Sequence, residues 1–115
     1  MGRLTTHILD TAQGGPAAGV AIRLYRLGDQ REQLVGTTTN SDGRTEHALL
    51  DGDSMITGTY ELEFDIGNYF RQGDVALDDP AFLDTVVIRF SVKGDEHYHV
   101  PLLCSPWSYS TYRGS

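Results

Sequence analysis

The chain has 115 residues, a length that suits one folded domain, and we predict a single domain over residues 1–115. Its formal charge of −7 argues against nucleic acid or an anionic membrane as a partner, because binding either needs clustered Lys and Arg. The single cysteine, Cys104, excludes an internal disulfide framework and a cysteine-based zinc site. With no apolar run of membrane-spanning length and no signal peptide before Leu4, we predict a cytoplasmic protein.

Short segments that alternate apolar and polar residues recur along the chain, and a period of two is typical of half-buried strands. In chain order, the predicted strands cover residues 4–10, 20–25, 33–39, 59–65, 85–92, 96–104 and 107–112. One short helix is predicted over residues 66–72. Several short strands at hairpin spacing indicate an all-β fold, an antiparallel β-sandwich.

The connections between these strands carry turn and loop sequences. Residues 11–19 are rich in Gly, Ala and Pro, and residues 40–43 read Asn-Ser-Asp-Gly, a strong turn sequence because these residues tolerate a positive φ. Arg44 stands at the exit of that turn, where an arginine is ordinarily a surface charge. We predict that residues 49–58 and the acidic stretch 73–82 are loops.

The strand over residues 96–104 has two different faces. One face is apolar and is predicted to point to the core; it consists of Tyr98, Val100, Leu102 and Cys104. The other face carries His97 and His99. In an antiparallel sheet such a face commonly meets water, a partner or a ligand. The return strand places Ser110 and Tyr112 on one face.

Three segments carry motifs that occur together in one known family. They are, in order, His7-Ile8-Leu9-Asp10, Asp42-Gly43-Arg44 and Tyr112-Arg113-Gly114-Ser115. With this set the chain resembles the transthyretin-like 5-hydroxyisourate hydrolases from about residue 4 to residue 115, although Cys104 stands where that family usually has Leu. The resemblance implies a transthyretin-like antiparallel β-sandwich with one short helix. It also implies a homotetramer, a dimer of dimers with its sites at the subunit interface.

The same resemblance implies an activity and the residues that carry it. The activity is hydrolysis of the cyclic amide of 5-hydroxyisourate during urate breakdown, which yields a carboxylated ureidoimidazoline and needs neither metal nor cofactor. The implied catalytic residues are His7, Arg44 and His99. The implied substrate-binding residues are Tyr112, Arg113, Ser115 and Ser110. We expect His97 to be peripheral.

These residue types suit that reaction, which needs a water molecule made nucleophilic near neutral pH and a stabilised oxyanion. Histidine titrates in that range, so either His7 or His99 can act as the general base while the other donates a hydrogen bond. Arg44 offers a fixed cation and planar donors to an oxygen-rich ring. The amino-acid sequence leaves open which histidine takes the proton.

Three other functions stay open at this stage. One is a zinc site held by His7, His97 and His99, although the cation of Arg44 would repel a metal ion. Another is a non-catalytic transthyretin-type carrier of small hydrophobic ligands, whose channel would want Lys at position 7 and Glu at position 44. The third is a general sandwich module for protein contacts, which would explain the alternation but not the terminal motif.

Overall fold

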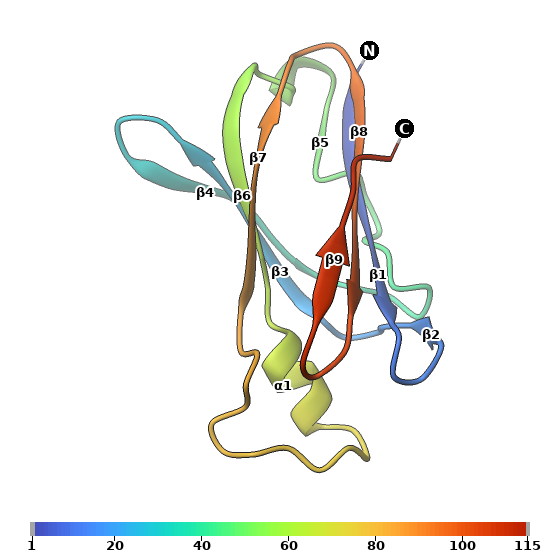
Figure 1. Ribbon diagram of the computed structural model, residues 1–115. Coiled ribbons are helices and arrows are strands. Elements are labelled where there is room, and N and C mark those ends of the chain that lie inside the picture. Colours follow the sequence, from blue (N-terminus) through green and yellow to red (C-terminus); the bar gives the residue numbers. More distant parts are fainter. Residues whose placement is uncertain (1, 115) are drawn as a thin grey trace.

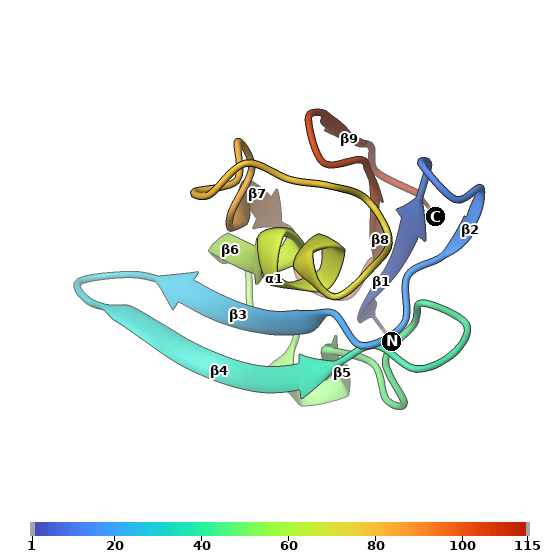
Figure 2. The same cartoon turned by 90° about the horizontal axis from the view of Figure 1, so that it is seen from below.

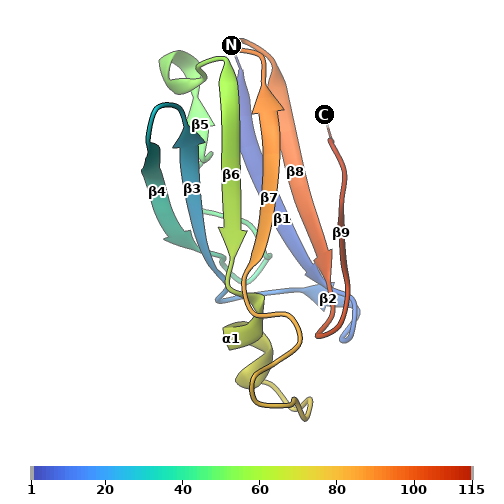
Figure 3. The same ribbon diagram turned by 60° about the vertical axis from the view of Figure 1, so that its left-hand side comes forward.

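The computed structural model describes residues 2–114 and confirms the predicted β-sandwich with one short helix. The first sheet contains β1 (Arg3–Asp10), β2 (Gly15–Pro16), β5 (Leu50–Asp51), β8 (His97–Cys104) and β9 (Tyr109–Thr111). The second sheet contains β3 (Ala21–Leu27), β4 (Arg31–Thr38), β6 (Gly58–Phe64) and β7 (Val86–Val92). Figures 1 and 3 show the two sheets from different sides, with strand orders β2-β1-β8-β9 and β4-β3-β6-β7, and β5 pairs with β1.

The core lies between the two sheets and is built by alternation along each strand. On β6, Tyr60, Leu62 and Phe64 are fully buried, as their spacing predicted. On β8, the predicted apolar face is buried as well, and it consists of Tyr98, Val100, Leu102 and Cys104. Removing one such leucine side chain from water is worth about 2 kcal/mol, so these alternating rows hold the sheets together.

One prediction about the sandwich is wrong, because the sheets are not wholly antiparallel. The strands β1 and β8 run parallel over their full length, with Thr5 beside His99 and His7 beside Pro101. These strands come from opposite ends of the chain, so the connection between them passes through the second sheet and does not force them to be antiparallel. This pairing sets how the side chains of β1 and β8 lie relative to one another in the candidate site.

The shortest strands and the 3-10 turn could not be predicted from the alternation of apolar and polar residues. The predicted loop 49–58 contains β5 and a 3-10 turn (Gly52–Ser54), and two-residue strands such as β2 and β5 are too short to show a period. The predicted return strand is shorter than expected, because β9 ends at Thr111. Beyond it, Gly114 forms an isolated antiparallel bridge with His99.

The helix α1 (Ile66–Arg71) agrees with the predicted helix and lies across one end of the sandwich, as Figure 2 shows. Phe70 of this helix is buried against the core. The hydroxyl of Tyr69 donates to the carboxylate of Asp10 at 2.8 Å and so joins the helix to the end of β1. Within residues 2–114 no helix is long and apolar enough to cross a membrane.

Candidate active site

The outer face of the first sheet is the side of β1 and β8 that points away from the core. Alternation places on this outer face Arg3, Thr5, His7 and Leu9 from β1, and His97, His99, Pro101 and Leu103 from β8. The parallel register puts Thr5 directly beside His99, with His7 two residues further along the same strand. The two histidines predicted to be catalytic therefore lie on neighbouring strands and on one face.

The turn over residues 40–44 brings Arg44 to His7. These two residues form an isolated antiparallel bridge, and the amide of Ile8 donates to the carbonyl of Gly43 at 2.8 Å. The His7 ring is fixed from the same turn, since its Nε2 lies 2.8 Å from the carbonyl oxygen of Asp42. The predicted turn thus does more than reverse the chain, because it positions both the arginine and one histidine.

The conformation of this turn is set by two of its residues. The side-chain oxygen of Asn40 accepts hydrogen bonds from the amides of Asp42 and Arg44, at 2.9 and 3.2 Å. Gly43 has φ of +75°, and a Cβ there would collide with the carbonyl oxygen of Ile8. Glycine is therefore required at this position for the turn to pack against β1.

His99 is held by β1 on one side and by the end of the chain on the other. Its Nδ1 lies 2.9 Å from the hydroxyl oxygen of Thr5. Its backbone exchanges two hydrogen bonds with Gly114, at 2.7 and 3.3 Å. A Cβ on Gly114 would lie 3.0 Å from the imidazole Cδ2 of His99, so the glycine permits the close passage of the tail over the ring.

The electrostatic environment of His99 connects it with the other two predicted catalytic residues. Its pKa is lowered, first by partial burial and then by the positive charge of Arg44 and of His7. Both effects disfavour a further positive charge on the ring. His99 is therefore held in its neutral form at physiological pH, in which one ring nitrogen donates and the other accepts.

Two hollows open on this face, and sequence reasoning missed two of the residues that line them. One, of about 250 Å³, is lined by His97 and His99, and the other, of about 220 Å³, is lined by Arg44. Arg3 and Thr5 line both. The signal that would have found them is parity, since residues 3 and 5 share the face of His7 on an alternating strand.

The residues predicted to bind substrate do not all lie on the outer face of the first sheet. Ser110 pairs with Leu103 in the register of β8 and β9, which puts it on the outer face beside the histidines' strand. Tyr112 is 60% exposed and lines a groove of about 230 Å³ at the edge between β7 and β9. Ser115 lies outside the described residues.

Arg113 points away from the outer face. Its guanidinium carbon lies 4.0 Å from the centroid of the Tyr98 ring, which belongs to the opposite face of β8. One guanidinium nitrogen also donates to the Glu96 carboxylate at 3.2 Å and to the His97 carbonyl at 3.0 Å. The structure thus brings His7, Arg44 and His99 together but does not bring Arg113 to them.

Comparison with known proteins agrees with these motifs. The HIUase/Transthyretin family model matches residues 4–114. The chain belongs to this family. It is 59% identical to 5-hydroxyisourate hydrolase 2 of Rhizobium meliloti (strain 1021), over 99% of this chain and 97% of that protein.

Solved structures give the same result for the fold. A Klebsiella pneumoniae 5-hydroxyisourate hydrolase superposes with a TM-score of 0.83 at 35% identity, and the match covers the whole of both chains. The crystal structure of an (S)-allantoin synthase superposes with a TM-score of 0.94 at 44% identity. That match covers 99% of this chain but only 44% of the longer synthase chain.

The single cysteine of the chain takes part in the core. Cys104 is buried, and burial raises the pKa of its thiol to about 12, with a smaller contribution from the charge of Asp10. A thiol is nucleophilic only as the thiolate, so this one is inert near neutral pH. It acts as a small apolar side chain at the end of β8.

The register of β1 and β8 does not favour the alternative of a three-histidine zinc site. His97 pairs with Arg3, four residues before His7 on the parallel strand. At a rise of about 3.3 Å per residue, that offset places the backbones of His97 and His7 about 13 Å apart along the strands, so the two imidazoles start far from a shared ligand position. In the part of the chain that the structure describes, no three His, Cys, Asp or Glu side chains are grouped as metal ligands.

Proposed function

We propose that this protein is a 5-hydroxyisourate hydrolase, a hydrolase that opens the cyclic amide of its substrate, with His7, Arg44 and His99 as its catalytic residues. The observation that carries the proposal is the convergence of two imidazoles and one guanidinium on the outer face of the first sheet. The relative at 59% identity bears the same activity in its name. The reaction requires the acid–base groups and the fixed cation that this face supplies.

Arg44 supplies the charge that such a reaction needs. Among residues 2–114 no acidic side chain forms an ion pair with it, whereas its backbone is fixed by Asn40. A guanidinium with no acidic partner among residues 2–114, beside the two imidazoles, favours an oxygen-rich anion. It also stabilises negative charge on the carbonyl oxygen when water adds to the amide.

The proposal includes an assembly, a homotetramer formed as a dimer of dimers with a site at each subunit interface. Two features support it: the hollows lie open on the outer face of a single chain, and half-buried Leu9 and Leu103 lie further along the same face. A second copy over this face would deepen the site and cover the leucines. In that assembly Ser110, Tyr112 and Ser115 bind substrate, while Arg113 holds the tail in place through Tyr98 and Glu96.

The competing function is a non-catalytic carrier of small apolar ligands. Its channel would want Lys at position 7 and Glu at position 44, but the chain has His7 and Arg44. We further propose a cytoplasmic location and a reaction without metal or cofactor, since the chemistry needs only the groups named.

One assay tests the proposal. Purified protein is mixed with freshly made 5-hydroxyisourate, and the ultraviolet decay is compared with buffer, with and without a strong chelator. We expect rapid decay that the chelator does not slow. A decay equal to that in buffer would reject the hydrolase, and loss of activity with the chelator would reject the metal-free mechanism.

A further inference from the structure

Each of the two site histidines has one ring nitrogen already engaged, and the partners differ in chemistry. The Nε2 of His7 faces the carbonyl oxygen of Asp42 at 2.8 Å. A backbone carbonyl only accepts hydrogen bonds, so this nitrogen must carry the proton. In the neutral ring the unprotonated nitrogen is then Nδ1, which is the atom able to take a proton from water.

The partner of His99 is a hydroxyl, which leads to the opposite arrangement. The Thr5 hydroxyl lies 2.9 Å from Nδ1, and this ring nitrogen is its one hydrogen-bond partner among residues 2–114. The neighbouring Thr6 donates instead to the Val100 carbonyl at 2.7 Å, on the core side. With no carbonyl or carboxylate among residues 2–114 to receive it, the Thr5 proton is donated to Nδ1, which leaves the proton of neutral His99 on Nε2.

We infer that the Asp42 carbonyl and the Thr5 hydroxyl fix the tautomers of the two histidines and so give them different roles. His7 is the general base through Nδ1, and His99 donates a hydrogen bond through Nε2–H. This assignment rests on the proposed function. It makes Thr5 a positioning residue, because it acts through His99 and not on the substrate. Neither role is visible in the sequence motifs, where the two histidines are equivalent.

The proton balance of the reaction follows from this assignment. Nδ1 of His7 removes a proton from water, and the resulting hydroxide forms a bond to the amide carbonyl carbon. The π electrons move to the carbonyl oxygen, which accepts hydrogen bonds from Nε2–H of His99 and from Arg44. When the carbonyl re-forms, the ring C–N bond breaks, and the proton held by His7 passes to the leaving nitrogen. The new carboxylic acid releases its proton to solvent.

The protonated nitrogens are observable without any turnover. Protein labelled with ¹⁵N in histidine, read by long-range ¹H–¹⁵N correlation at about pH 7.5, distinguishes Nδ1–H from Nε2–H rings. The signals are assigned with His7→Asn and His99→Asn. We expect both rings as the Nε2–H form, and in Thr5→Val only the His99 signal should change, toward a mixture. An Nδ1–H form of His99 in the unmodified protein would overturn the assignment, whatever the activity.

Kinetics then separate positioning from a structural role. Thr5→Val removes one hydrogen bond, so kcat should fall about tenfold while KM changes by less than about twofold. Thr5→Ser keeps the hydroxyl and should restore most of the loss. The matched control is Thr59→Val, on the other sheet, whose hydroxyl lies 3.4 Å from that of Ser91 and should not matter.

The pH profile decides between the histidines. Because His7 is the base, the acidic limb of kcat should keep its midpoint in Thr5→Val. A shifted midpoint would mean that His99 is the base and would overturn the assignment, as would unchanged kcat in Thr5→Val with intact melting. If the unmodified protein does not hydrolyse 5-hydroxyisourate, the proposed function fails, and the spectra still decide the tautomers.

Discussion

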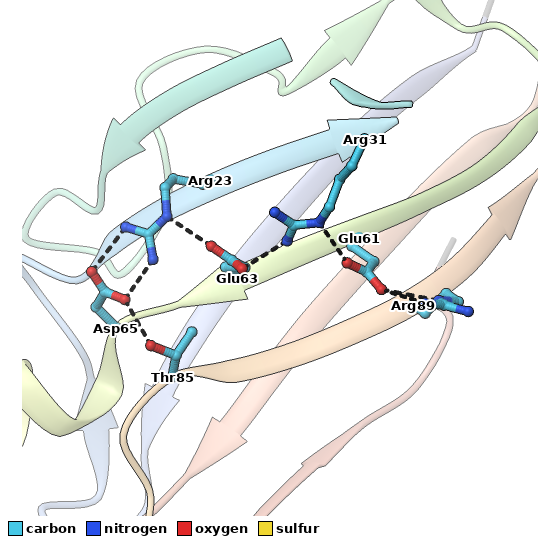
Figure 4. A network of polar contacts seen from close by, with 7 residues as sticks. All are labelled: Arg23, Arg31, Glu61, Glu63, Asp65, Thr85 and Arg89. Carbon is cyan, nitrogen blue, oxygen red and sulfur yellow. Dashed lines mark hydrogen bonds and ion pairs between the residues drawn. The ribbon is translucent and has the colours of Figure 1, made fainter. Parts of the chain in front are cut away.

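The outer faces of the two sheets both carry arginines, but the arginines have different partners. On the second sheet, shown in Figure 4, three arginines interleave with three carboxylates; the set consists of Arg23, Arg31, Arg89, Glu61, Glu63 and Asp65. The ion-pair distances there run from 2.7 to 3.1 Å. On the first sheet, Arg44 has no acidic partner within residues 2–114, and the histidines face a carbonyl and a hydroxyl.

This difference separates a structural charge cluster from a reactive one. Paired charges neutralise each other and leave little field for a ligand, whereas a cation with no acidic partner among the described residues attracts an anion. The ion pairing on the second sheet also lowers carboxylate pKa values there. The pKa of Asp65 is lowered, chiefly because Arg23 hydrogen-bonds to its carboxylate. Four changes to the protein or its conditions would test this contrast.

Reversing the charge of Arg44 should have the largest effect. In Arg44→Glu we expect turnover of 5-hydroxyisourate to fall by at least about a hundredfold, because the field at the developing oxyanion changes sign. The fold should persist, since the residue follows an exposed turn. Arg26→Glu, a charge reversal on the second sheet, is the control and should keep its activity. Near-normal turnover in Arg44→Glu would show that the guanidinium does not contact substrate.

Removing either site imidazole should come next. His7→Asn and His99→Asn should each lower kcat by about a hundredfold, the usual value of positioned acid–base catalysis. His97→Asn should cost far less, since His97 is exposed and lies at the start of β8. Steady-state kinetics with circular dichroism on all three variants would check this order. If His97 were critical and His99 dispensable, the site would have to be moved along the strand.

Much of this site could be predicted before the structure, and the missing part has a clear origin. Alternation was enough to place His7 and His99 on outward faces, since a period of two survives in any sheet. It could not show that β1 and β8 pair in parallel, because that depends on how the chain crosses between sheets. The role of Thr5 therefore stayed hidden, and so did the offset between His97 and His7 along the two strands.

The segment after β9 shows a second limit of prediction from alternation. The terminal motif predicted that Arg113 would reach substrate, yet its neighbours in space are Tyr98 and Glu96. Parity along the tail assigns residues to a face only while the strand continues, and β9 ends at Thr111. Beyond β9, the described part of the tail pairs with the first sheet at one isolated bridge, between Gly114 and His99.

Releasing the tail should have a smaller effect than removing an imidazole. In Arg113→Leu the cation–π contact and the two hydrogen bonds are lost, so we expect kcat to fall about tenfold as the tail leaves His99. Melting temperature should change little, because the core strands are complete without it. Arg26→Leu, another arginine-to-leucine change but on the second sheet, is the control. Full activity in Arg113→Leu would show that tail and site are independent.

The smallest expected effect concerns the ion pairs on the outer face of the second sheet. It is an effect on stability and not on turnover. The folded-state pKa values of Glu61, Glu63 and Asp65 are lowered; arginine hydrogen bonds contribute to all three, and for Glu63 they outweigh desolvation. A carboxylate with a lowered folded pKa contributes stability above its unfolded pKa of about 4, and that contribution is lost as the pH falls through the folded value. Urea unfolding between about pH 7 and pH 3 should therefore show a declining free energy below about pH 4.

The variant Asp65→Asn assigns this decline to the ion pairs on the outer face of the second sheet. Because these pairs are partly exposed, the substitution should cost about 1 kcal/mol at pH 7 and less at pH 3, where the native carboxylate is itself being protonated. Asp29→Asn, in the exposed turn between β3 and β4, is the matched control and should follow the unmodified protein at both pH values. An equal cost of Asp65→Asn at pH 7 and pH 3 would mean that this aspartate stabilises through shape and not charge. The arginines of the second sheet would then stabilise the fold without charge pairing, and the two faces would differ less in their electrostatics.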